Sequence, residues 1–228
     1  MNKVLELDSK SSSAYYMRGL FFSKRAEYDK AIADYTKAIE IEPTNSAEYT
    51  ARANVLARKK DFGAALADVN HALELNPASF EAYTTRARIF SQTGEYAKAR
   101  NDFDEANKIV PRDPHFLNNF AWFLVTCPDE KFRNAGDAAE YIDIALEKLP
   151  NESSSWDTCA AVFAENGDFE DAVVWEERFL SSKELTATQR KNGLERLALY
   201  KSNQSFKEMP EVSKDPVTAS TTPAPPGK

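Results

Sequence analysis

The stretch AIADYTKAIEIEP, from Ala31 to Pro43, decides the fold because the chain repeats it at a fixed interval. After 34 residues the chain reads ALADVNHALELNP, from Ala65 to Pro77, and after another 34 it reads ARNDFDEANKIVP, from Ala99 to Pro111. Each copy has the apolar spacing of an amphipathic helix and ends on a proline, which a helix does not readily continue through. None of the copies carries a catalytic pattern, so the repetition indicates an architectural role.

Small and aromatic side chains recur in register with this repeat in three consecutive units. Small residues let two helices cross closely, because a larger side chain would push their axes apart. Aromatic and aliphatic residues fill the space between helices, and each stabilises the fold by roughly 1.5–3 kcal/mol when it is buried. The recurring small residues are Ala31, Ala65 and Ala99, then Ala38, Ala72 and Ala106, and the recurring aromatic residues are Tyr15, Tyr49 and Tyr83.

These columns resemble the tetratricopeptide repeat, whose two helices carry aromatic, small and alanine positions in a fixed order before a closing proline. The resemblance covers residues 12–113 in three unbroken units. It implies an all-α fold, namely a right-handed α-solenoid of stacked helix–turn–helix repeats whose first helices line a concave groove. It also implies a non-enzymatic scaffold that binds other proteins.

Five repeat units are predicted between residues 12 and 185, followed by a capping helix over 186–202. The predicted unit boundaries are 12–45, 46–79, 80–113, 114–152 and 153–185. Residues 1–11 align with the end of a repeat and are expected to belong to a preceding one. Residues 203–228 are rich in proline, serine and threonine, so they are predicted to form a disordered tail.

Charged residues form a second regular feature of the first three units. Arginine replaces the leucine that the family favours on the first helix, at Arg18, Arg52 and Arg86. Aspartate recurs on the second helix at the same interval, at Asp34, Asp68 and Asp102. We predict an arginine–aspartate ladder between the two helices of each unit, with a column of solvated charges as the alternative.

The turn between the two helices of a unit favours glycine in this family. Gly94 satisfies the preference in the third unit, whereas Ala26 and Lys60 stand there in the first two. A left-handed backbone conformation costs a non-glycine residue roughly 1–2 kcal/mol. We therefore expect the first two turns to have a different shape.

The fourth unit carries an insertion within TCPDEKFRNAGD, from Thr126 to Asp137. Asp113 and Pro114 suit the start of its first helix, and Pro128 ends that helix. The surrounding NNFAWFLVTCPDEKFRNAG resembles a variant with an AWxLxTCPD pattern found in bacterial tetratricopeptide proteins. No chemistry is attached to that variant, so residues 125–137 are expected to form a polar loop with a structural role.

The fifth unit departs from the pattern on its second helix, with Glu176 in place of an aromatic residue and Phe179 in place of alanine. Both changes suit a terminal unit, beyond which less is packed. Thr186 is expected to cap the last helix. The predicted packed side of this helix comprises Leu194, Leu197 and Ala198. Its predicted solvent side comprises Gln189, Arg190, Glu195 and Arg196.

The composition fits a folded helical protein and excludes several classes of function. Hydrophobic residues make up 42% and charged residues 29% of the chain, and glycines number only seven. The formal net charge of −7 argues against a nucleic-acid partner. The sequence has neither an apolar run of membrane-spanning length nor a secretory signal at its start, so no membrane partner is predicted. A cytoplasmic location is favoured, with a signal or anchor upstream left open.

The first helices of the units expose a stripe that we expect to line the groove. The candidate partner-binding residues are Tyr16, Lys24, Thr50, Asn54, Arg58, Thr84, Arg88, Gln92, Asn118 and Trp122. The cations in the stripe fit an extended peptide with acidic side chains or a C-terminal carboxylate, and its aromatic residues could anchor apolar side chains. The alternative is an ordinary solvated face. The stripe is similar to the carboxylate clamp of chaperone-binding members only at Asn54 and Arg88, so the clamp is incomplete.

Two other functions stay open. The chain could be a structural spacer or oligomerisation module, because Tyr15, Tyr16, Phe21 and Phe22 on the first helix could support self-association through the N-terminal end. An enzyme would need a site, and the only candidates are Cys127 or Cys159 paired with His71 or His115. Buried thiols are the simpler interpretation of the cysteines. No glycine-rich phosphate loop and no Cys/His metal spacing occurs, so no cofactor and no metal is predicted.

Overall fold

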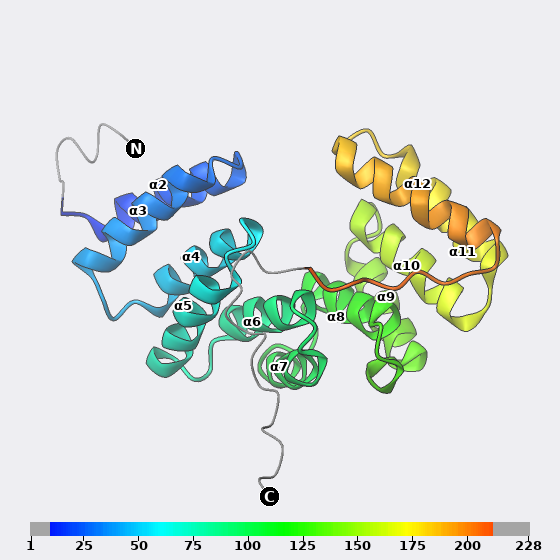
Figure 1. Cartoon of the computed structure of the whole chain (residues 1–228), viewed down its shortest axis with the longest axis horizontal. Helices are drawn as coiled ribbons and strands as arrows, with labels where there is room; N and C mark the ends of the chain where they lie inside the picture. The colour runs from blue at the N-terminus through cyan, green and yellow to red at the C-terminus, as the bar shows by residue number, and fades with distance from the viewer. Residues whose placement is uncertain (1–9, 212–228) are drawn as a thin grey trace, which may run out of the picture. The chain divides into compact units, whose positions relative to one another are not determined.

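The computed structural model describes residues 10–211. In this range the fold is all-α, with eleven α-helices, one short 3₁₀ helix and no β-strand (Figure 1). The helices are α2 (Ser12–Lys24), α3 (Tyr28–Ile41), α4 (Ser46–Arg58), α5 (Phe62–Leu75), α6 (Phe80–Gln92), α7 (Tyr96–Ile109), α8 (Pro114–Thr126), η1 (Glu130–Phe132), α9 (Ala135–Lys148), α10 (Ser153–Asn166), α11 (Phe169–Ser181) and α12 (Ala187–Lys201). None of the helices in these residues is long and apolar enough to cross a lipid bilayer. The preceding repeat predicted over residues 1–11, and the tail beyond residue 211, lie outside the described residues.

Two compact units make up the chain. Among the described residues, the N-terminal unit comprises residues 10–89 with Glu211, and the C-terminal unit comprises residues 90–210. Successive helices pack as hairpins within each unit: α2 on α3 and α4 on α5 in the first, α8 on α9 and α10 on α11 in the second. This architecture is an all-α helical-repeat solenoid, which confirms the predicted fold class.

Polar side chains cap the predicted helix starts. The Asp113 carboxylate accepts a 2.8 Å hydrogen bond from the Phe116 amide at the start of α8. Thr186 and Gln189 form a reciprocal capping box at the start of α12. Each cap satisfies amide groups that the first turn of a helix leaves without intrahelical partners.

The alanine columns form the centre of the N-terminal unit. Ala31, Ala38, Ala65 and Ala72 are fully buried, and Gly19 on α2 is also buried. A Cβ atom on Gly19 would lie only 2.6 Å from Cε1 of Tyr35. The second-helix aromatic residue therefore packs directly on the backbone of the first helix, which is why the repeat requires a small residue there.

The predicted arginine–aspartate ladder is confirmed in the first two units. Arg18 binds Asp34 through two hydrogen bonds of 2.6 and 2.7 Å, and Arg52 binds Asp68 through two of 2.7 Å. Both aspartates are buried. Two parallel bonds between a guanidinium and a carboxylate are stronger and more directional than a single contact. In the third unit Arg86 donates a 2.8 Å bond to Asn70, and its pairing with Asp102 stays a prediction.

Each of these arginines also lies over the aromatic residue three positions earlier. The guanidinium carbons are 5.5 Å, 5.9 Å and 5.6 Å from the ring centroids of Tyr15, Tyr49 and Tyr83. Cation–π contact and ion pairing together explain why arginine replaces the apolar leucine, since its stem packs on a ring while its head reaches a carboxylate.

The predicted difference in turn shape is wrong. Ala26 and Lys60 have φ angles of 57° and 63°, in the same left-handed region as Gly94 at 81°. The helix–helix contacts on either side hold these two residues in a conformation that their Cβ atoms disfavour.

We therefore expect Ala26→Gly and Lys60→Gly each to stabilise the N-terminal unit by about 0.5–1 kcal/mol, because glycine adopts this conformation without the steric cost. Urea unfolding followed by circular dichroism would measure the gain. Ala57→Gly, within helix α4, is the matched control and should destabilise the unit by about 1 kcal/mol. A loss of stability at both turn positions would contradict the explanation.

The insertion in the fourth unit is compact and not a bulging loop. It forms one 3₁₀ turn, Glu130–Phe132, and the Asn134 amide donates a 2.9 Å bond to the Leu124 carbonyl. The Arg133 guanidinium donates a 3.1 Å bond to the Cys127 carbonyl and pairs with Glu165 at 2.8 Å. The insertion thus fastens itself to α8 and holds the carboxylate of a residue on α10.

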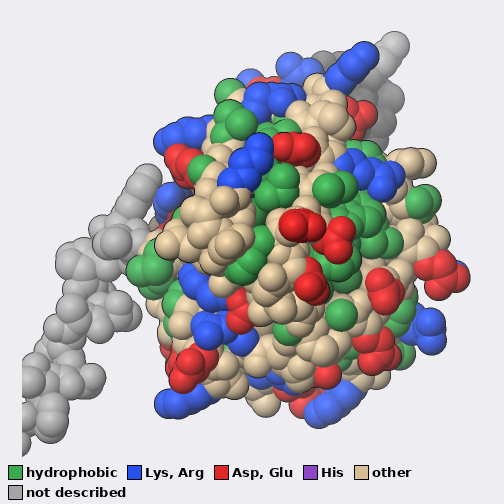
Figure 2. Space-filling view, turned by 90° about the vertical axis from the view of Figure 1, so that its right-hand side faces the viewer, with side chains coloured by type: hydrophobic (Ala, Val, Ile, Leu, Met, Phe, Trp, Pro, Cys, Tyr) green, Lys and Arg blue, Asp and Glu red, His purple; other side chains and the backbone are tan. Residues whose placement is uncertain are grey.

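The predicted packed face of the last helix is also wrong. Gly193, Arg196 and Tyr200 are buried on α12, whereas Leu194 is 55% exposed. A Cβ atom on Gly193 would lie 2.8 Å from Cε1 of Phe179, so the glycine sets how closely α12 approaches α11. Glu176 and Phe179 are both buried beneath α12, contrary to the expectation that little packs beyond them. Figure 2 shows this end of the C-terminal unit, where apolar side chains lie among acidic and basic ones.

Candidate peptide-binding surfaces

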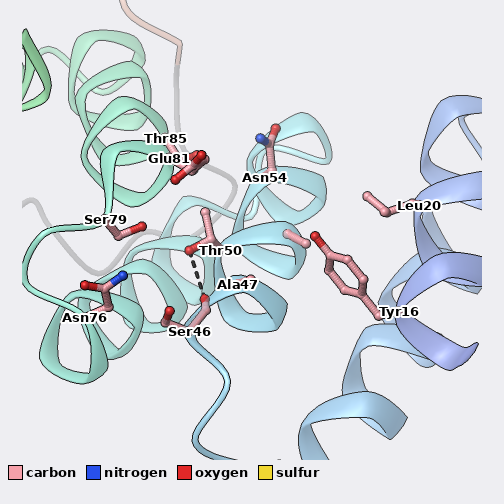
Figure 3. A pocket seen from close by; sticks show the side chains of 11 residues that line it. Tyr16, Leu20, Ser46, Ala47, Thr50, Asn54, Asn76, Ser79, Glu81 and Thr85 are labelled. Atoms are coloured by element: carbon pink, nitrogen blue, oxygen red, sulfur yellow. Dashed lines mark hydrogen bonds between the residues drawn. The ribbon is translucent and has the colours of Figure 1, made fainter. Parts of the chain in front are cut away.

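The N-terminal unit has a hollow of about 420 Å³ on the first-helix side of its repeats. Helices α2, α4 and α6 and the loop before α6 contribute its walls (Figure 3). The lining residues are Tyr16, Leu20, Ser46, Ala47, Thr50, Ala51, Asn54, Asn76, Ser79, Glu81 and Thr85. Three predicted site residues, Tyr16, Thr50 and Asn54, thus meet at one surface.

Tyr16 forms the aromatic side of the hollow, and its ring is held in place by packing. Tyr16 contacts Tyr35 with ring centroids 5.8 Å apart, and its hydroxyl points across the hollow toward α4 (Figure 3). Burial raises the pKa of the Tyr16 hydroxyl, and the nearby carboxylates of Glu48 and Glu81 raise it further. The hydroxyl therefore stays protonated and can donate a hydrogen bond.

The hydroxyl groups of two predicted site threonines form hydrogen bonds within their own helices. The Thr50 hydroxyl donates a 3.0 Å bond to the Ser46 carbonyl, and the Thr84 hydroxyl donates a 2.9 Å bond to the Phe80 carbonyl. Thr50 nevertheless lines the hollow, whereas Thr85 and not Thr84 does so on α6. Glu81 and Thr85 were missed because the predicted stripe on α6 included Thr84, whereas the adjacent position, Thr85, faces the hollow.

Arg88 is a cation that contacts a residue of this surface. Its guanidinium donates a 2.6 Å bond to the Asn54 side-chain oxygen, so it reaches from α6 to a residue that lines the hollow. Burial, with a smaller contribution from the neighbouring Arg58, lowers the pKa of Arg88 to about 10. Within residues 10–211 no carboxylate pairs with Arg88. A half-buried cation without a carboxylate is an incomplete electrostatic arrangement.

The remaining predicted residues of this stripe lie at the helix ends. Arg58 and Lys24 are exposed at the ends of α4 and α2, and Gln92 is half-buried at the end of α6. None of these three is among the residues that line the hollow. Phe21 and Met17 are exposed on α2, and the predicted self-association through this end stays a prediction.

In the C-terminal unit the equivalent face of the first helices is covered by the chain itself. After α12 the chain runs back past α10 to α8 (Figure 1). The Trp122 indole donates a 2.8 Å bond to Glu208, and its ring lies 5.9 Å from that of Phe206. Residues 203–211 were predicted to belong to a disordered tail, but the structure places Phe206 and Glu208 of this stretch against Trp122. Asn118 is buried one turn earlier on α8.

A buried cluster of charged side chains, Arg196, Asp157 and Glu176, lies next to Trp122. Arg196 is 5% exposed and pairs with Asp157 at 2.7 Å and with Glu176 at 3.4 Å. Burial raises the pKa of both carboxyl groups, that of Glu176 to about 9 with a further contribution from Asp157. Asp157 lies closer to the guanidinium, so we assign the negative charge to Asp157 and the proton to Glu176. Sequence reasoning missed the cluster, although Glu176 at an aromatic position was its signal.

The cysteines do not form the activated nucleophile that a Cys–His enzyme requires. Cys127 and Cys159 are free and buried, as predicted. Burial raises the pKa of both thiols, that of Cys159 to about 12. The His71 ring meets the Tyr49 ring edge to face, with centroids 4.6 Å apart, and its Nδ1 contacts Glu74. A catalytic thiol instead needs a lowered pKa and a neighbouring base.

Family models for the tetratricopeptide repeat match residues 12–45 and 69–101. These two segments of the chain match the tetratricopeptide repeat. No curated protein matches the sequence.

Solved structures share the fold of these tetratricopeptide repeats. Yeast Tom70 is 23% identical with a TM-score of 0.65, over 88% of this chain and 42% of that one. Cut9–Hcn1 of the APC/C is 14% identical with a TM-score of 0.75, over 87% of this chain and 38% of that one. YrrB is 15% identical with a TM-score of 0.53, over 85% of this chain and 97% of that one. The chain thus spans less than half of the first two, and the likeness shows a common architecture.

Proposed function

We propose that this protein is a protein-interaction scaffold that binds an extended segment of a partner through the hollow of its N-terminal unit. Solenoids of helical repeats present extended concave surfaces to their partners, which supports the proposal. YrrB, a tetratricopeptide protein of the same fold, is described as having an unusual peptide-binding site. The two buried, high-pKa thiols favour this function over an enzyme.

The observation that carries the proposal is the position of Arg88 beside the hollow. A carboxylate of the partner would form charge-assisted hydrogen bonds with its guanidinium, and Asn54 already holds that group in place. Arg58 adds a second positive charge, which lowers the pKa of Arg88 and would be offset by the same carboxylate. A partner segment with an acidic side chain or a C-terminal carboxylate fits this end.

Two other groups of the hollow have different chemistry. Glu81, on the same helix α6 as Arg88, supplies a carboxylate. The protonated Tyr16 hydroxyl, on α2 across the hollow, supplies a donor beside an apolar ring. A partner residue with a donor group or an aliphatic side chain fits there. We therefore infer a segment that places a carboxylate at Arg88 and a donor or apolar residue near Tyr16.

The test is binding of short labelled peptides with acidic C-termini to the full chain, followed by fluorescence anisotropy. Arg88→Ala should weaken the tightest peptide about 10- to 100-fold, because a hydrogen bond to a charged group stabilises by roughly 1.5–3 kcal/mol. Lys37→Ala is the control, since Lys37 is an exposed cation on the second helix α3. Binding that survives Arg58→Ala combined with Arg88→Ala would place the partner elsewhere.

A further inference from the structure

The surface covered by residues 204–210 in the C-terminal unit has the features of a peptide-recognition site. We call it the tail-docking surface and define it by Trp122, Val125 and Thr126 of α8, Glu165 of α10 and Arg196 of α12. All three helices contact the segment: α8 and α10 are the first helices of the fourth and fifth repeats, and α12 is the capping helix. This surface lies in the C-terminal unit and is independent of the hollow described above.

The end of α8 creates the first recognition element. Pro128 follows the helix closely, so its last carbonyl groups need other donors. The Phe123 and Leu124 carbonyls accept bonds from the amides of Cys127 and Asn134. The last two carbonyls accept from the tail: that of Val125 from the Lys207 ammonium at 3.1 Å, and that of Thr126 from the Glu208 amide at 2.8 Å. A helix C-terminus also favours positive charge, so an ammonium group suits this point.

Side-chain contacts distinguish three consecutive residues of the segment. Phe206 packs on Trp122 and on the cluster around Tyr200, with the Arg196 guanidinium 5.7 Å from its ring. The Lys207 ammonium pairs with Glu165, whose carboxylate is held from the other side by Arg133. The Glu208 carboxylate accepts the bond from the Trp122 indole.

We propose that the tail-docking surface binds a partner segment with an aromatic residue followed by lysine and glutamate, and that Phe206–Lys207–Glu208 occupies this site in the chain itself. The order of the charges matters, because a glutamate in the second position would face Glu165 and the α8 carbonyls. The occupant is displaceable. It contains no regular secondary structure, and Met209 directly after it is 73% exposed.

The internal segment competes with a partner through its high local concentration. A tethered segment has an effective concentration on the order of millimolar, so a free peptide binds only the fraction of molecules whose surface is open. Weakening the internal segment should therefore raise the apparent affinity for a peptide in trans, while the surface itself is unchanged.

The experiment uses the full chain and a labelled peptide with the sequence QSFKEMP. Phe206→Ala combined with Glu208→Ala should bind this peptide at least about tenfold more tightly than the unaltered chain. Met209→Ala is the matched control in the same segment and should bind like the unaltered chain. The peptide QSFEKMP, with the two charged residues exchanged, should not bind either protein. A folded double variant that binds neither peptide would overturn the proposal.

A second measurement needs no substitution. Hydrogen exchange of the unaltered chain should show the Glu208 amide protected, because it donates a bond to the Thr126 carbonyl. Excess QSFKEMP peptide should remove that protection while leaving the amides of α8 protected. Light scattering distinguishes exchange of the segment between two copies. A dimer that forms through the tail and excludes the peptide would overturn the proposal. Peptide binding that persists with Arg58→Ala and Arg88→Ala separates this site from the hollow.

Discussion

Replacing Arg196 with alanine should lower the free energy of unfolding of the C-terminal unit by about 3–5 kcal/mol at pH 7, because it removes one partner of a buried ion pair. Arg196 is the cation that contacts both Asp157 and Glu176, at 2.7 and 3.4 Å. Its stem and guanidinium also lie against Trp122, Phe179 and Phe206. The substitution therefore leaves an uncompensated carboxylate and a void together.

Tryptophan fluorescence during urea unfolding is the appropriate measurement, because Trp122, Trp156 and Trp175 all belong to the C-terminal unit. Lys191→Ala is the matched control, since it removes an exposed cation from the same helix and should cost less than about 0.5 kcal/mol. The cost of Arg196→Ala should shrink toward pH 4, where protonation neutralises the remaining carboxylate. A cost equal to that of the control at pH 7 would show that the cluster does not hold a buried charge.

Glu176→Gln should change the pH dependence of stability more than any other conservative substitution in the chain. The pKa of Glu176 is raised to about 9 in the fold, mainly by burial, whereas an unfolded glutamate titrates near 4.3. Between these values the folded state binds one more proton than the unfolded state. The stabilising contribution of the protonated group is thus fully present below about pH 4 and is lost as the pH rises through about 9, by up to about 1.4 kcal/mol per pH unit.

Glutamine resembles the protonated carboxyl group and has no such titration. Between pH 5 and pH 9 the free energy of unfolding of the variant should therefore fall less steeply than that of the unaltered chain. The two slopes should differ by up to about 1.4 kcal/mol per pH unit. Urea midpoints collected across this range would measure the two slopes. Glu177→Gln, on the exposed neighbour that pairs with Lys201, should leave the slope unchanged. Parallel slopes for the Glu176 variant and the unaltered chain would mean that Glu176 is ionised in the fold.

The repeat architecture was predictable because its determinants are local and periodic. The alanine columns indicate which side of each helix must be buried, and the closing prolines indicate where each helix ends. Stacked copies of the same hairpin can bury that side. The pairs Arg18–Asp34 and Arg52–Asp68 were predictable for the same reason, since a fixed interval in the sequence becomes a fixed distance between paired helices. Part of the hollow followed likewise from the first-helix stripe.

Features at the C-terminal end were not predictable from that rule, because nothing repeats there. The packed face of α12 was expected to be its apolar side, yet Gly193 and the buried Arg196 face α11 because Glu176 requires a cation and close approach requires a glycine. Similarly, the composition of residues 203–211 indicates a tail, and only the open carbonyl groups at the end of α8 show where those residues bind.

By itself the sequence determined that the chain folds into helical hairpins, because one helix of this pattern cannot bury its own apolar stripe. The tertiary structure alone decided where the charges that do not repeat find their partners. Among the described residues no carboxylate pairs with Arg88, whereas Lys207 and Glu208 bind groups on α8 and α10. The physical reason is that burial of apolar stripes is repeated along the chain, whereas the pairing of individual charges depends on which side chains the folded helices bring together.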